Sequence, residues 1–305
     1  MEGYPKEVDV IGLVPPFPIS LDKAMIRVTP ALHGGVEVEA YLERQPSIYL
    51  DQDSLSDLAT TPNRRARFIG TFQKKGTLLF SWTNALDLSG PQGRSAVLIK
   101  SFLDELGAHW IPLEINPWRV ERKESGAEPS SGTPCVSESF LRAYYPHIHG
   151  DPLTLGKIVD LINQDRGKFL TESERLKHEA YLTVASWRAR YNVNPAGLDR
   201  FLPSLRYNPE QPATFILREM ERLVTREAKS HKWKPNDGVD FMHAIVSAAY
   251  GDFVLLDKHW KARVSKVAPP RSYPWLYYRF ELDDFLEAFE KCEVQTGPRD
   301  MGYRP

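Results

Sequence analysis

The chain has 305 residues, of which 42% are hydrophobic and 26% are charged, and its formal net charge is −1. This composition is typical of a globular protein, and the length suffices for one large domain or two modest ones. No apolar run reaches the roughly 20 residues that a membrane helix needs, so we expect no membrane partner. The near-neutral charge excludes a global basic field that would attract a polyanion, so any nucleic-acid contact must rest on a local patch.

The cellular compartment is predicted from the N-terminal sequence and from the cysteines. The N-terminus lacks a basic stretch followed by an apolar core, which is the pattern of a secretory signal. The two cysteines, Cys135 and Cys292, form neither a metal-ligand spacing nor a disulfide framework. We therefore expect a reduced, cytoplasmic protein without structural zinc.

The first third of the chain alternates short apolar runs with helical patterns. Residues 1–45 are predicted to be an N-terminal extension, with a half-buried strand over 36–42. Ser47 to Asp51 is a short apolar run that ends in an acid, which indicates a buried strand. Further strands are predicted over 77–81 and 110–113, and helices over 54–60, 63–75, 83–88 and 95–106. Pro112 places the last of these strands at an edge of the sheet.

The middle of the chain has a different character. Residues 116–139 are polar and rich in Ser, Gly, Glu and Pro, which predicts a loop or a disordered segment. Helical patterns follow over 153–191 and 213–229, separated by a proline-interrupted stretch. We interpret residues 116–235 as a mostly helical insertion.

The last third returns to alternation. A helix is predicted over 236–250, a strand over 252–257 that again ends in an acid, and then a helix, a strand over 275–280 and a final helix over 282–292. Strands alternating with helices predict an α/β fold, here a three-layer α/β/α sandwich around a mainly parallel sheet. The main domain is expected to combine residues 46–115 with 236–305.

Four aspartates stand where such a sheet would bring them together. Asp51 and Asp257 follow two predicted strands, Asp240 lies in the first turn of the helix before the second of them, and Asp87 lies six residues after Ser81. Ligands of open parallel sheets bind outside the carboxyl ends of the strands. Two carboxylates about 4 Å apart repel by about 4 kcal/mol at an effective dielectric near 20, and a cation reverses that sign. Oxygen-only ligands favour Mg²⁺ or Mn²⁺, ions that support phosphodiester hydrolysis.

The same segments resemble the motifs of PIN-domain nucleases. Ile48–Leu58 resembles their opening strand and loop, and Ser81–Leu88 their second acidic motif. Asp240–Ile245 with Asp252–Asp257 resembles their closing helix and strand. The resemblance implies a PIN-like fold and a Mg²⁺- or Mn²⁺-dependent endonuclease, most often acting on RNA. It assigns the catalytic and metal-binding roles to Asp51, Asp87, Asp240 and Asp257.

The chain departs from that pattern at three positions and in one length. Asp87 stands where the family usually has Glu, Asp53 where it often has Asn, and Leu255 where a polar residue is common. The insertion is also longer than the usual connection. These departures leave open a catalytically weak or inactive PIN-like scaffold that binds nucleic acid or protein. They also leave open an insertion that recognises substrate or a regulator, and a homodimer.

Other acidic and histidine side chains near these motifs have plainer interpretations. Asp237 is interpreted as a helix N-cap, and Asp53 either as a residue behind the metal ligands or as a turn residue. His243 lies one turn from Asp240, and we interpret it as a buried, hydrogen-bonded histidine.

The basic and aromatic groups are interpreted in the same way. Arg64, Arg65 and Arg67, with Lys74 and Lys75, form a basic stretch near the first motif that is expected to be solvated surface rather than phosphate contacts. The aromatic residues of the last strand, Trp275, Tyr277 and Tyr278, are expected to pack in the core or at the sheet edge rather than to stack on bases.

Overall fold

The computed structural model describes residues 26–30, 36–40, 46–90, 93–107, 109–130, 133–138, 140, 154–267 and 275–293. Within the first 45 residues, β1 (Ile26–Pro30) and β2 (Val36–Ala40) pair as antiparallel strands, with Val28 opposite Val38. The strand predicted over 36–42 is therefore present. The remainder of the predicted N-terminal extension lies outside the described residues.

The centre of the protein is a five-stranded parallel sheet, which confirms the predicted α/β class. Its order is β5-β4-β3-β6-β7. The strands are β3 (Ser47–Leu50), β4 (Thr77–Phe80), β5 (Trp110–Pro112), β6 (Phe253–Leu255) and β7 (Trp275–Tyr277). β5 lies at an edge, as Pro112 predicts. The last strand is shorter than predicted, because the chain turns into the 3₁₀ helix η4 (Arg279–Glu281).

Helices cover both faces of this sheet, so its inner strands are buried on both sides and consist of nearly continuous apolar runs. On one face, the Phe253 ring lies 5.8 Å from the rings of both Phe285 and Phe289. On the other face, the Tyr49 ring lies 5.6 Å from that of His243. Successive side chains of a strand point to opposite faces, so each strand contributes to two cores.

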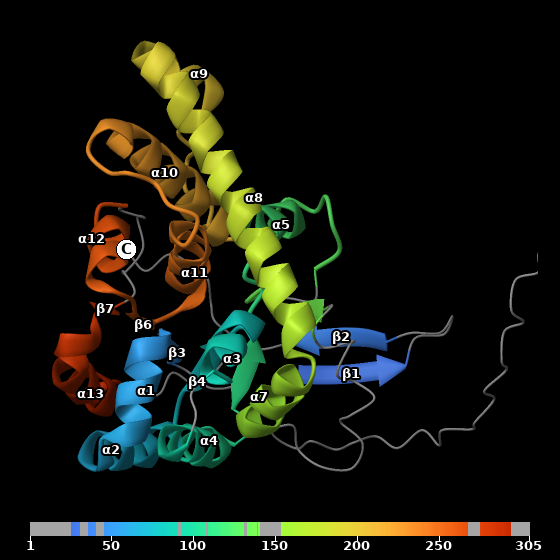
Figure 1. Cartoon of the computed structure of the whole chain (residues 1–305), viewed down its shortest axis with the longest axis vertical. Helices are drawn as coiled ribbons and strands as arrows, with labels where there is room; N and C mark the ends of the chain where they lie inside the picture. The colour runs from blue at the N-terminus through green and yellow to red at the C-terminus, as the bar shows by residue number, and fades with distance from the viewer. Residues whose placement is uncertain are drawn as a thin grey trace, which may run out of the picture.

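Figure 1 shows the two helical layers on either side of the strands. One layer holds α1 (Gln52–Thr60), α2 (Pro62–Phe72), α4 (Arg94–Leu106) and α13 (Leu282–Lys291). The other holds α3 (Trp82–Leu88), α11 (Asp237–Tyr250) and α12 (Lys258–Val264). The helices predicted in both thirds of the chain are present, with boundaries shifted by a few residues.

The middle of the chain is helical, and its first helix begins earlier than predicted. Its helices are α5 (Pro117–Glu124), α7 (Leu155–Gln164), α8 (Arg166–Val193), α9 (Leu198–Phe201) and α10 (Pro212–Arg226). The prediction of a loop over 116–139 is therefore wrong for 117–124. Asn116 caps α5 by accepting a hydrogen bond from the backbone N–H of Arg119, and Pro117 occupies the first helical position, so the end signals outweigh the polar composition.

The helical segment is joined closely to the main sheet domain. Glycine at position 238 lets α11 approach α8, since a Cβ there would lie 2.9 Å from the carbonyl oxygen of Lys177 and 3.0 Å from Cβ of Ala180. Buried residues of α8 and α10, such as Val184 and Met220, belong to the same hydrophobic core as the strands. In Figure 1, α8 runs as one long helix from α7, past α11, to α9.

Candidate active site

The topology of the sheet marks one place where a ligand is expected. From β3 the chain proceeds outward through β4 to β5, and it then returns to build β6 and β7 on the other side of β3. The order of the strands therefore reverses between β3 and β6. In open α/β sheets, ligands bind at the carboxyl ends of the strands on either side of such a switch point.

Asp51 and Asp257 flank this switch point. Asp51 follows β3 directly, and its backbone N–H donates to the carbonyl oxygen of Leu255 in β6, 3.2 Å away. Asp257 follows β6 after one further residue. The two aspartates thus come from the ends of adjacent strands, which lie about 4.8 Å apart in a sheet.

Both aspartates also cap the helix that follows them. Asp51 Oδ1 accepts from the backbone N–H of Ser54 at 2.9 Å, at the start of α1. Asp257 Oδ1 accepts from the backbone N–H groups of His259 and Trp260 at 2.7 and 2.9 Å, at the start of α12. Capping fixes the direction of each carboxylate. A carboxylate has about four acceptor positions, so these bonds leave capacity for a further ligand.

A buried chain of hydrogen bonds lies beneath the acidic residues and joins β3, α3 and α11. Nδ1 of His243 is hydrogen-bonded to the Tyr49 hydroxyl, and its Nε2 to the Thr83 hydroxyl at 2.6 Å. The Thr83 hydroxyl lies 2.7 Å from that of Ser81, and Asn84 Nδ2 donates to the Tyr49 hydroxyl at 3.3 Å. Satisfied buried polar networks fix side chains in one arrangement, so this chain holds the two helices in register at the strand ends.

Burial keeps the histidine of that network uncharged. It lowers the pKa of His243 to about 3, so the ring is neutral at ordinary pH. Both of its ring nitrogens are hydrogen-bonded. The interpretation of His243 as a buried, satisfied histidine is confirmed.

Asp87 and Asp240 are presented by the two helices that this network joins. Asp87 lies one turn after Thr83 on α3, and Asp240 lies one turn before His243 on α11. Both are exposed. The protein around the Asp87 carboxyl group raises its pKa, while the positive charges of Lys177 and Arg166 oppose the shift.

Electrostatics link the acids to one another. Burial, with the charges of Asp53 and Asp257, raises the pKa of Asp51 to about 6, although hydrogen bonds from Ser54 oppose the shift. Although Asp240 is exposed to solvent, partial desolvation by the surrounding protein and the charges of Asp257, Asp237 and Asp87 raise its pKa to about 6, against a hydrogen bond from Trp260. The aspartates predicted from sequence therefore influence one another, as neighbours at one edge do.

The donor set at this edge consists of carboxylate oxygens, which suits a hard cation such as Mg²⁺ or Mn²⁺ better than zinc or copper. Among the described residues, no group of three or more His, Cys, Asp or Glu side chains stands close enough to hold a metal ion as they are arranged. The oxygen donors therefore match the ligand preference of such an ion in their chemistry, but not in their arrangement among the described residues.

Two neighbouring aspartates have roles that differ from one another. The prediction that Asp237 is the N-cap of α11 is wrong, because Asn236 occupies that position. Asp237 Oδ2 instead accepts from the backbone N–H of Lys234 at 2.8 Å and lies 3.3 Å from Nε2 of His231. Asp53 is exposed in the first turn of α1, 3.9 Å from the guanidinium group of Arg279.

The arginines of α2 are paired with acids on other helices. Arg64 bonds to Asp283 at 2.7 Å, and it also contacts Asp57. Arg65 pairs with Glu105 at 2.5 Å. Arg67, likewise, pairs with Glu290 on α13 at 2.9 Å. These ion pairs agree with the interpretation of the arginines as solvated surface. The same interpretation is wrong for Lys75, which is buried and donates to the carbonyl oxygen of Glu290 at 3.1 Å.

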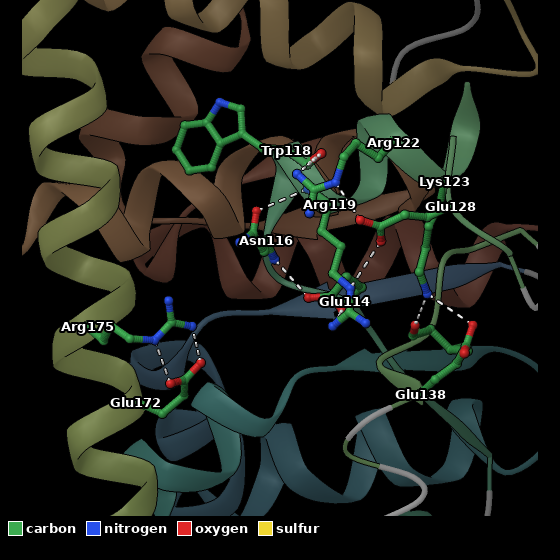
Figure 2. Close-up of polar contacts among 11 residues, drawn as sticks. Glu114, Asn116, Trp118, Arg119, Arg122, Lys123, Glu128, Glu138, Glu172 and Arg175 are labelled. Carbon is green, nitrogen blue, oxygen red and sulfur yellow. Dashed lines mark hydrogen bonds and ion pairs between the residues drawn. The ribbon is translucent and has the colours of Figure 1, made fainter. Parts of the chain in front are cut away.

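A cleft of about 770 Å³ opens between α5 and α8, and its lining includes Met242 of α11 but none of the four aspartates. Figure 2 shows its polar walls. Arg175 on α8 pairs with Glu172 of its own helix at 2.5 Å, and Arg122 on α5 pairs with Glu128 at 2.5 Å. Because each wall neutralises its own arginines, the cleft offers no unbalanced positive charge.

Sequence reasoning did not single out Tyr49, Thr83 and Asn84, which form the buried network. A signal for them was present, since each is a polar group within a segment that is otherwise buried. Buried polar groups must find partners, but the sequence does not show which distant residues supply them.

We compared the chain with family models, with curated proteins and with solved structures, and none of them matches it. Within the described ranges, no helix has the length and apolarity needed to cross a membrane. The fold and the site together define an α/β protein with an acidic edge at the switch point of a parallel sheet.

Proposed function

We propose that this chain is a PIN-like, Mg²⁺- or Mn²⁺-dependent endonuclease that hydrolyses phosphodiester bonds in RNA. The observation that supports it most is the position of Asp51 and Asp257 at the ends of β3 and β6, on either side of the switch point. Asp87 and Asp240 are added to them by α3 and α11, which the Thr83–His243 hydrogen bond ties together. This order of four acids on these elements is the one that the resemblance to PIN domains implies.

The residues of the chain would have distinct roles in such a reaction. Asp51, Asp87, Asp240 and Asp257 would hold the ion, which would lower the pKa of a bound water and offset phosphate charge. The N-capping bonds of Asp51 and Asp257 orient their carboxylates in advance, so little reorganisation is needed when substrate binds. Neutral His243 holds Tyr49 and Thr83 in place and carries no charge of its own into the site.

Cationic side chains near Asp87 suit a polyanionic substrate. Lys177 and Arg166 on α8 both act electrostatically on the Asp87 carboxylate. Arg166 donates to the carbonyl oxygen of Leu86 at 3.1 Å, which fixes its guanidinium group beside α3. Lys177 is itself paired with Glu174 at 2.7 Å, so the local positive charge beside Asp87 comes mainly from Arg166.

Cleavage of RNA by the purified chain tests the proposal. In Mn²⁺ or Mg²⁺ the wild type should cut an RNA substrate, and Asp51→Asn and Asp240→Asn should each abolish cutting. Asn conserves the shape of the side chain and caps a helix as well as Asp does, so folding is preserved. Asp160→Asn, an exposed aspartate paired with Lys100 away from the edge, is the matched control. Equal cutting by both site variants and the wild type would show that the site is assigned wrongly.

A second candidate is a PIN-like scaffold that binds nucleic acid or protein without catalysis, as a homodimer or as the partner of a protein regulator. Its support is the absence, among the described residues, of a ready group of three metal ligands, together with the apolar Leu255 before the fourth acid. Calorimetry separates the two candidates. Heat of binding on titration with Mn²⁺ or Mg²⁺ supports the nuclease, and its absence at millimolar metal supports the scaffold.

A further inference from the structure

The segment after β7 carries one exposed aromatic ring, Phe280, and beside it one that is partly exposed, Tyr278. Phe280 is 84% exposed, which is unusual for so large an apolar side chain. Tyr278 packs against it edge to face, with ring centroids 6.0 Å apart. We call Tyr278 and Phe280 the aromatic platform. In contrast, Tyr277 is partly buried and stacks on Phe253, and Trp275, although exposed, also stacks on Phe253, so both pack at the edge of the sheet as predicted.

The aromatic platform lies at the same edge of the sheet as the four aspartates. β7 is parallel to β6, with Tyr277 opposite Leu255, so Tyr278 leaves the sheet at the edge where Asp257 follows β6. Lys261, one turn after Asp257 on α12, places its ammonium group 5.2 Å from the centre of the Tyr278 ring. The platform is therefore adjacent to the helix that Asp257 caps.

The other flank of the platform touches the helix that Asp51 caps. Arg279 lies between the two aromatic residues in sequence, and its side chain is 50% exposed. Its Nε is 3.5 Å from Asp57 Oδ2 and its Nη1 is 3.9 Å from Asp53 Oδ2, both on α1. Arg279 thus ties the platform segment to α1, as Lys261 ties Tyr278 to α12, and both helices begin at the switch point.

We propose that Tyr278 and Phe280 form a stacking surface for an unpaired base of a nucleic-acid strand whose backbone crosses the acidic edge. The proposal rests on the proposed nuclease function and gives its substrate class as single-stranded. Neighbouring strands lie about 4.8 Å apart, so the ends of β7 and β3 are about 10 Å apart. That span suits a nucleotide next to the one whose phosphate lies at the aspartates. Bases within a duplex stack on each other, so only an unpaired base reaches an aromatic ring.

Charge supports stacking rather than phosphate contact as the source of affinity. Arg279 is paired with Asp57, and Lys261 with Glu281 on η4, so neither cation is free to neutralise a phosphate. Affinity that comes from released counterions falls steeply with salt, whereas stacking is much less sensitive to it. The contribution of Phe280 to binding is therefore expected to change little with salt concentration.

Binding of a short fluorescein-labelled oligouridylate to the full chain, followed by fluorescence anisotropy in EDTA, tests the proposal without cleavage. Phe280→Ala should weaken binding about 5- to 100-fold, the range expected for the loss of one stacked base. Phe280→Trp should restore it. Trp275→Ala is the matched control, because Trp275 is also exposed but begins β7 at the opposite edge. An oligothymidylate of the same length shows whether the platform distinguishes RNA from DNA.

Several results would overturn the proposal. They are failure of the wild type to bind the strand, equal binding by wild type and Phe280→Ala, and equal competition by duplex RNA. Light scattering adds a further one, since conversion of a dimer to a monomer by Phe280→Ala would mean that the platform is an interface between copies of the chain. The two proposals fail separately. If the chain cleaves RNA in Mn²⁺ but Phe280→Ala binds the strand as well as the wild type, only the nuclease proposal stands. If binding depends on Phe280 but no cleavage occurs, only the platform proposal stands.

Discussion

Replacing Asp51 by Asn should stabilise the metal-free protein at alkaline pH. Burial and the negative charges of Asp53 and Asp257 raise the pKa of the Asp51 carboxylate from 3.8 to about 6. In the folded state it therefore holds its proton more tightly than in the unfolded state. Stability from such a group is present below the unfolded pKa and is lost as pH rises through about 6.

The size of the effect follows from the shift. The pKa of Asp51 rises by about two units, and at 1.36 kcal/mol per unit the charged carboxylate lowers the free energy of unfolding by at most about 3 kcal/mol. Asn carries no charge, and it accepts the capping bond from Ser54 as Asp does. We expect Asp51→Asn to raise the free energy of unfolding by about 1 to 3 kcal/mol at pH 8, and by almost nothing at pH 3.5.

Urea unfolding in EDTA at both pH values, followed by circular dichroism, measures this difference. Asp57→Asn, on the same helix, is the control with the opposite sign. Burial alone would raise the pKa of Asp57, but hydrogen bonds from Thr61, Arg64 and Arg279 and the charge of Arg64 lower it, so its loss should destabilise the protein at pH 8. A destabilised Asp51→Asn at pH 8, or a gain that is independent of pH, would refute the reasoning about the crowded edge.

Three further predictions concern the structure that supports the edge. Gly238→Ala should cost about 1 to 3 kcal/mol by forcing α11 away from the Lys177 carbonyl group, measured by urea unfolding. Glu124→Ala should cost about 1 to 2 kcal/mol, because the Glu124 carboxylate accepts two bonds from Thr214 at the start of α10, while Glu124→Gln should cost less; thermal melting compares the two. Because the pKa of His243 is lowered to about 3, only the unfolded state binds its proton between about pH 6.5 and 3. The wild type should therefore lose stability as pH falls through that range, and a His243→Phe variant should lack this pH dependence.

The parts of this fold that depend on local pattern could be predicted from the sequence. Short apolar runs before Asp51 and Asp257 predicted β3 and β6, because buried parallel strands need apolar residues on both faces. Pro112 placed β5 at an edge for a similarly local reason, the missing N–H. The polar composition of helix α5 predicts a loop, and only its capping residues, Asn116 and Pro117, indicate a helix there.

The parts that depend on contacts between distant residues could not be predicted in this way. Tyr49, Thr83 and His243 are separated by 34 and 160 positions (83 − 49 and 243 − 83), and nothing in their local sequence pairs them. The exposure of Phe280 has the same origin, since the strand pattern over 275–280 breaks only because η4 turns toward α1. That the four aspartates bind one ion stays a prediction.

Binding of Mn²⁺, followed by the loss of the paramagnetic resonance signal of the free ion, tests that central claim most directly. The wild type should bind the ion at micromolar to millimolar concentrations, and Asp51→Asn and Asp240→Asn should each bind it much more weakly. Asp160→Asn should match the wild type. Absence of binding by the wild type, or equal binding by all of these proteins, would contradict the metal site at the ends of β3 and β6.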